Sequence, residues 1–143
     1  MNPPTLPNPE GIVLFAHGAR DPQWALPFQS VLAQVRALRP EAEVRLAFLE
    51  LMSPDLATTG DELAGLRCPI ITVVPLFLGA GGHVRRDLPA LASALAARHP
   101  GLQVRVAAAV GESPVVISAL AACAAHPRMP GDSVAAPSGP PSP

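Results

Sequence analysis

The chain has 143 residues, enough for one domain with a real hydrophobic core and too few for two domains of ordinary size. Apolar residues make up 49% of the chain but aromatic residues only 3%, so we expect a core built mainly from Ala, Val and Leu. A net charge of −1 argues against a general nucleic-acid or anionic-membrane binder, because both need a basic surface. The apolar runs are too short to span a bilayer, and the N-terminus lacks the features of a signal peptide. We therefore expect a cytoplasmic protein.

The first half of the chain predicts two strand-helix pairs. An apolar run over 11–16 predicts the first strand, and a helix over 22–38 follows it, with Asp21 as N-cap and Pro22 at the first helical position. A second strand is expected over 44–49. Ser53 and Pro54 are expected to open a second helix that runs to Leu66, by the same cap-and-proline pattern.

The second half repeats this alternation. The run 70–78 is apolar on both faces, as a central parallel strand requires. A helix from about Val84 to Arg98 follows the glycine loop, and Pro89 moves its expected start toward Asp87. A fourth strand is predicted over 102–107, and Ser113 and Pro114 open a last helix that ends near Ala125.

This order predicts an α/β fold, a single lobe with a four-stranded parallel sheet and helices on both faces. The globular domain is expected over 10–126, between a flexible N-terminus (1–9) and a disordered tail (127–143) rich in Pro, Ser and Gly. Cys68 and Cys123 form no CxxC motif, and both are expected to be buried thiols and not a disulfide.

Three potential metal ligands follow predicted strands. His17 comes directly after the first strand, Glu50 closes the second, and His83 lies a few residues beyond the third. The carboxyl ends of parallel strands share one edge of the sheet, which is where open α/β folds bind ligands. Imidazole and carboxylate suit a divalent first-row metal such as cobalt, iron, nickel or zinc. The pattern therefore predicts metal handling at this edge.

Glycines and arginines surround these ligands. Gly79, Gly81 and Gly82 leave room near His83 for a large flat ligand, although an ordinary flexible loop would have the same composition. Three arginines lie near the two histidines and could bind an acidic substrate, or could simply be solvated surface charge; they are Arg20, Arg85 and Arg86.

The histidines have other possible roles. A histidine at a strand end can be a core imidazole bonded to the backbone, and His99 and His126 are expected to serve only as helix C-terminal residues. Phosphohistidine enzymes carry Arg-His-Gly at such a strand end, but Ala16 takes the place of that arginine here. The sequence has no P-loop, no Ser-His-Asp nucleophile elbow and no dinucleotide fingerprint.

The segments 17–22 and 75–89, together with Glu50, resemble the short form of the CbiX family of sirohydrochlorin chelatases. Members of this family resemble one half of the two-lobed class II chelatases, and the resemblance covers about residues 10–125. The family usually has His-Gly-Ser-Arg where this chain has Ala19 in the third position, which removes a hydroxyl but no ligand.

The resemblance implies an ATP-independent enzyme that inserts a divalent metal into sirohydrochlorin, with no nucleotide. Co²⁺ is the expected metal substrate, with Fe²⁺ and Ni²⁺ as alternatives. His17, His83 and Glu50 would present the metal and accept the two pyrrole protons. The arginines and loop glycines would bind the octacarboxylate ring, and a homodimer would complete the cleft. A metal or tetrapyrrole carrier without turnover, and a regulatory or structural dimer with core histidines, remain alternatives.

Overall fold

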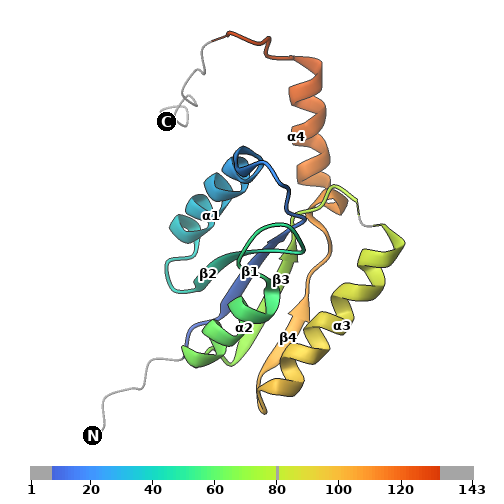
Figure 1. Ribbon diagram of the computed structural model, residues 1–143. Coiled ribbons are helices and arrows are strands. Elements are labelled where there is room, and N and C mark those ends of the chain that lie inside the picture. Colours follow the sequence, from blue (N-terminus) through green and yellow to red (C-terminus); the bar gives the residue numbers. More distant parts are fainter. Residues whose placement is uncertain (1–7, 80, 133–143) are drawn as a thin grey trace, which may run out of the picture.

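The computed structural model describes residues 8–79 and 81–132, without the side chain of His83. The four strands and four α-helices of this part alternate along the chain (Figure 1). The strands are β1 (Gly11–Ala16), β2 (Glu43–Phe48), β3 (Ile70–Pro75) and β4 (Gln103–Val106). The helices are α1 (Leu26–Leu38), α2 (Leu56–Gly65), α3 (Gly82–Arg98) and α4 (Pro114–Ala125), with short 3-10 helices η1 (Pro22–Ala25) and η2 (Val110–Glu112) before α1 and α4.

All strand pairs are parallel, and the strand order is β2-β1-β3-β4. This confirms the predicted four-stranded parallel sheet. The carboxyl ends of the strands therefore lie along one edge, at the top of the sheet in Figure 1. None of the described helices is long and apolar enough to cross a membrane.

The core alternates along β1, because successive strand residues point to opposite faces of a sheet. Val13 and Phe15 pack with side chains of α2 and α3, whereas Ile12 and Leu14 pack with Leu32 of α1 and its neighbours. Helices thus cover both faces, as predicted from the apolar runs.

The first two helices begin later than the sequence predicted. Asp21 caps a 3-10 turn by accepting from the N–H of Gln23 (2.9 Å), and regular α-helix starts only at Leu26. The prediction of Ser53 and Pro54 as the start of α2 was wrong. Asp55 is the N-cap and accepts from the N–H of Thr58 (2.8 Å). The carbonyl of Pro54 instead accepts from the N–H of Phe48 (2.9 Å), so Pro54 is bonded to the last residue of β2 and does not begin the helix.

Helix α3 begins earlier than predicted. It starts at Gly82 and continues through Pro89, with Gly81 as an extended N-cap. Pro89 lacks the N–H that would bond to the carbonyl of Arg85, and its ring crowds that carbonyl, but its position on the exposed side keeps the ring out of the core. The glycine loop is therefore shorter than the sequence suggested, and His83 lies in the first turn of a helix.

The prediction for the cysteines was correct for one of the two, and His99 and His126 lie where they were predicted. Cys68 is buried and burial raises the pKa of its thiol, but Cys123 is exposed on α4, so the expectation of two buried thiols was wrong for Cys123. His99 and His126 are the C-caps of α3 and α4, as predicted. Much of the predicted flexible N-terminus and tail, residues 1–7 and 133–143, lies outside the described residues.

A polar network ties the sheet together at its amino edge. The Glu10 carboxylate accepts from the Arg39 guanidinium, from the Thr72 hydroxyl and from the Arg105 guanidinium, each at 3.0 Å. The hydrogen bond from Arg39 is the largest cause of a lowered pKa at Glu10; burial, the next largest, opposes it, and the bonds from Thr72 and Arg105 add to the lowering. This network lies at the opposite edge from the candidate ligands.

Candidate functional site

Main-chain hydrogen bonds bring His17 and Glu50 together at the carboxyl edge of the sheet. The parallel pairing of β1 and β2 continues past the strands, because the N–H of Leu49 donates to the carbonyl of Ala16 (2.8 Å) and the N–H of Glu50 to that of His17 (3.0 Å). The two candidate ligands are thus neighbours on the adjacent segments that follow β1 and β2, as the sequence predicted.

Gly18 makes this close approach possible. Its φ is +95°, a backbone conformation that residues with a side chain rarely adopt. A Cβ atom built on it would lie 1.8 Å from the main-chain oxygen of Glu50. The chain can turn away after His17 only because this residue has no side chain. The glycine at position 18 therefore allows His17 and Glu50 to lie next to each other.

The His17 imidazole packs against the ring of Phe77. The two ring centroids are 4.2 Å apart, with an angle of 31° between the planes. Phe77 is buried, with its centroid 6.1 Å from that of Phe15, so it gives the half-buried imidazole a fixed platform. The sequence showed Phe77 only as one more apolar residue, and its contact with His17 was missed.

Glu50 is exposed, and its carboxylate takes part in none of the ion pairs among the described residues. It follows β2 in an irregular segment that continues to Leu51, which has a positive φ of 65°. A carboxylate in this place is accessible both to a metal ion and to a proton.

The third candidate ligand, His83, is described only by its main chain. That main chain lies in the first turn of α3, which begins after the end of β3 at the same edge of the sheet. The position of its side chain, and any contact with His17 or Glu50, lies outside the described part. Among the side chains that are described, no three His, Cys, Asp or Glu groups come close enough to hold a metal ion.

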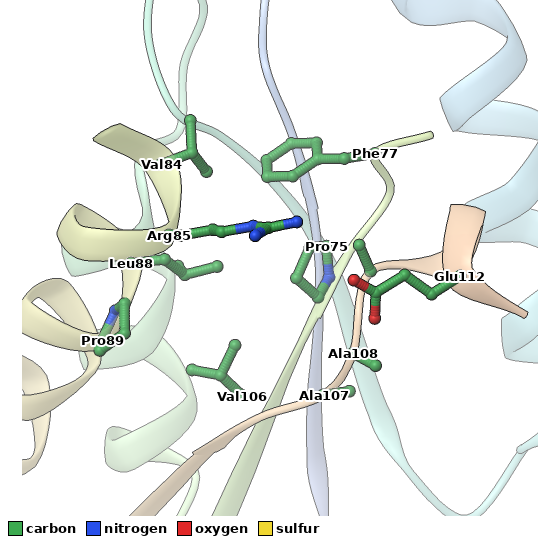
Figure 2. A pocket seen from close by; sticks show the side chains of 11 residues that line it. Pro75, Phe77, Val84, Arg85, Leu88, Pro89, Val106, Ala107, Ala108 and Glu112 are labelled. Atoms are coloured by element: carbon green, nitrogen blue, oxygen red, sulfur yellow. The ribbon is translucent and has the colours of Figure 1, made fainter. Parts of the chain in front are cut away.

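The predicted substrate-binding residues fall around this edge. Arg20 is exposed in the loop after β1, and Gly79, Gly81 and Gly82 are exposed between β3 and α3. Arg85 and Arg86 lie in the first two turns of α3, and Arg85, but not Arg86, lines the pocket shown in Figure 2. The Arg86 guanidinium approaches the carbonyl of Gly82 at 3.4 Å instead.

The 3-10 helix η2 supports the site from the side of β4. The N–H of Gly111 donates to the carbonyl of Phe77 (2.9 Å), and a Cβ atom on Gly111 would lie 1.9 Å from the carbonyl oxygen of Leu78. Glu112 follows and lines the same pocket as Arg85. Neither residue was predicted from the sequence, because both lie between predicted elements.

The fold and this edge define an open parallel α/β lobe with imidazole and carboxylate at adjacent strand ends. The chain belongs to the CbiX family, whose sequence model matches residues 11–126. The sirohydrochlorin cobaltochelatase of Saccharolobus solfataricus is 32% identical over 84 residues, which are 57% of this chain and 62% of that protein. The one from Methanopyrus kandleri is 31% identical over 78 residues, which are 54% of each chain. The chain thus matches less than two thirds of the length of these curated relatives.

Solved structures share the fold. A CbiX protein of cobalamin (vitamin B12) biosynthesis from Marinobacter aquaeolei VT8 superposes with a TM-score of 0.74 at 33% identity, over 82% of this chain and 96% of that one. SirB from Bacillus subtilis, solved with Fe³⁺, gives a TM-score of 0.71 at 24% identity, over 80% of this chain and 45% of that one. The second likeness concerns the fold alone.

Proposed function

We propose that this protein is a sirohydrochlorin chelatase that inserts Co²⁺ into the ring without ATP. The observation that carries the proposal is the meeting of His17, Glu50 and the first turn of α3 at one sheet edge, in a chain that belongs to the CbiX family. The names of the relatives from Saccharolobus and Methanopyrus support the same activity.

The chemistry of insertion suits these groups. A divalent metal replaces two pyrrole protons, so the site must present the metal and accept two protons. Neutral imidazoles of His17 and His83 would present the metal, and one of them or Glu50 would act as general base. Phe77 holds the His17 ring in one orientation, which favours catalysis by positioning.

The substrate would bind over this edge through its carboxylates. Arg20, in the loop after His17, and Arg85 and Arg86, in α3, would supply positive charge, and arginine binds carboxylates in a bidentate manner. Gly79, Gly81 and Gly82 are exposed between β3 and α3, and their lack of side chains leaves room there for the ring. A flat ring with eight carboxylates matches this combination.

The assembly we propose is a homodimer in which α4 contacts a second copy. Helix α4 carries no charged residue and has no buried one, and it extends beyond the carboxyl edge of the sheet (Figure 1). Val115 and Ile117 on it are 77% and 54% exposed. A helix that is apolar all round is normally buried. Leu51 and Leu78, also exposed, follow β2 and β3 at the same edge, so a second copy facing this edge would cover the apolar residues and close the cleft.

A metal or tetrapyrrole carrier is the alternative with the same binding residues, and a structural dimer is the alternative without them. An insertion assay with sirohydrochlorin and Co²⁺, Fe²⁺ or Ni²⁺, followed by the absorbance of the metallated ring, separates these classes. Repeated turnover by each protein molecule is expected of a chelatase, whereas a single stoichiometric event identifies a carrier. No binding of metal or ring would return the histidines to a structural role. The metal inserted fastest at equal free concentration identifies the substrate.

A further inference from the structure

A pocket of about 170 Å³ lies beside the candidate site, between α3 and the ends of β3 and β4 (Figure 2). Its walls are mostly apolar and include Pro75, Leu88, Pro89, Val106 and Ala107. Two charged side chains, Arg85 and Glu112, line it as well. Such a combination, apolar walls with few polar groups, is typical of a small-molecule site.

The pocket adjoins His17 through a shared wall. Phe77 lines the pocket and also stacks on the His17 imidazole at 4.2 Å. Val84, another lining residue, follows His83 directly in the chain. A molecule with one group in the pocket can therefore extend along Phe77 to His17.

The positive charge in the pocket comes from Arg85. Figure 2 shows its side chain reaching from α3 across the pocket toward Pro75, with the Glu112 carboxylate facing inward from the other side. Among the described residues, the Arg85 guanidinium takes part in none of the ion pairs, and neither does Glu112. A guanidinium has five N–H donors, so it can bind an incoming anion on one edge while Glu112 faces another.

We propose that this pocket receives one carboxylate arm of the tetrapyrrole substrate, with the arm's methylene carbons against the apolar walls and its carboxylate on Arg85. This inference rests on the proposed function and assigns Arg85 a role that Arg86 does not share, since Arg86 lies outside the pocket. A water molecule occupies about 30 Å³ in the liquid, so the volume accommodates a two- or three-carbon arm. The arm would fix the rotation of the ring over His17.

The test is a mutant cycle on the binding of metal-free sirohydrochlorin, followed by absorbance titration. Arg85→Ala is expected to weaken binding about tenfold, the effect of losing one charge-assisted hydrogen bond. Val106→Phe fills the pocket from the end of β4. Once the arm is excluded, Arg85→Ala in that background should change affinity by less than about twofold, because the two changes act on one contact.

Arg20→Ala is the matched control, because Arg20 also carries charge near His17 but lies outside the pocket. Its effect on affinity should be the same with and without Val106→Phe. Ala108→Phe fills the pocket from another wall. It serves as a second filled variant in case the Val106→Phe ring turns outward or that variant unfolds. Thermal melting detects unfolding of either variant. A full Arg85→Ala effect in both filled backgrounds overturns the pocket assignment alone. A wild-type protein that binds no tetrapyrrole overturns the proposed function together with it.

Discussion

A methyl group on Gly18 would lie 1.8 Å from the main-chain oxygen of Glu50, at the point where the two candidate ligands are joined through their backbones. Gly18 also has a φ of +95°, so the missing side chain is required both by space and by conformation. The geometry of the candidate site thus depends on a residue that has no side chain to act as a ligand.

Gly18→Ala is therefore expected to lower the free energy of unfolding by about 2 kcal/mol or more and to separate His17 from Glu50. Chemical denaturation measures the first effect and metal insertion the second. Gly79→Ala is the control, because an added Cβ there meets nothing within 4 Å, and its stability should stay close to wild type. Equal stability of the two variants would contradict the backbone geometry described for Gly18.

Gly111→Ala tests the support of the site from the side of β4. An added Cβ would meet the Leu78 carbonyl oxygen at 1.9 Å and push η2 away from the segment that carries Phe77. We expect a loss of about 1 to 3 kcal/mol in unfolding free energy and weaker ring binding. Gly65→Ala, in α2 with open space around it, should be neutral or slightly stabilising. Ring binding unchanged in Gly111→Ala would show that η2 does not position the site.

His17→Ala tests the proposed function directly. We expect metal insertion to fall about 100-fold or more, the range for a lost catalytic base, with little loss of stability because the imidazole is only half-buried. Circular dichroism and thermal melting check the fold. His126→Ala removes an exposed histidine at the C-cap of α4 and should keep wild-type activity. Near-normal turnover in His17→Ala, or a protein that unfolds, would refute the role of His17.

The sequence predicted the sheet and the strand-end placement of His17 and Glu50, because apolar runs and strand ends are local patterns. It did not predict the contact of Phe77 with His17 or the position of Glu112, since these depend on how η2 packs against the end of β3. The start of α2 was misplaced because Ser53 and Asp55 both fit an N-cap; in the structure the Asp55 side chain makes the cap bond, while the Pro54 carbonyl bonds to Phe48 of β2.

The Glu10 network predicts loss of stability in acid. The pKa of the Glu10 carboxyl group lies below the ordinary 4.5, chiefly because of the hydrogen bond from Arg39. The folded state therefore binds this proton more weakly than the unfolded chain does. The stabilisation is complete above the unfolded value and is lost as pH falls through the lower folded value. Melting temperature measured from pH 7 to 3 should drop below about pH 4.5 in wild type. Glu10→Gln should show a smaller drop, and the two curves should converge in acid; parallel curves would exclude this carboxylate.

The exposed apolar surface of α4 gives a prediction about assembly. A carboxylate at Val115 would be buried without a partner if α4 packs against a second copy, and the cost of several kcal/mol should dissociate the dimer. Light scattering after size exclusion should therefore give the dimer mass for wild type and the monomer mass for Val115→Asp.

Leu38→Asp provides the comparison, because Leu38 is also 77% exposed but is the last residue of α1. The next residue, Arg39, bonds to Glu10 at the opposite edge of the sheet. It should remain dimeric. Because the cleft would lose its cover, Val115→Asp should also weaken sirohydrochlorin binding, whereas Leu38→Asp should not. A wild-type monomer that still inserts metal would show that one lobe suffices and that α4 does not pack against a second copy; a dimer unaffected by Val115→Asp would place the interface elsewhere.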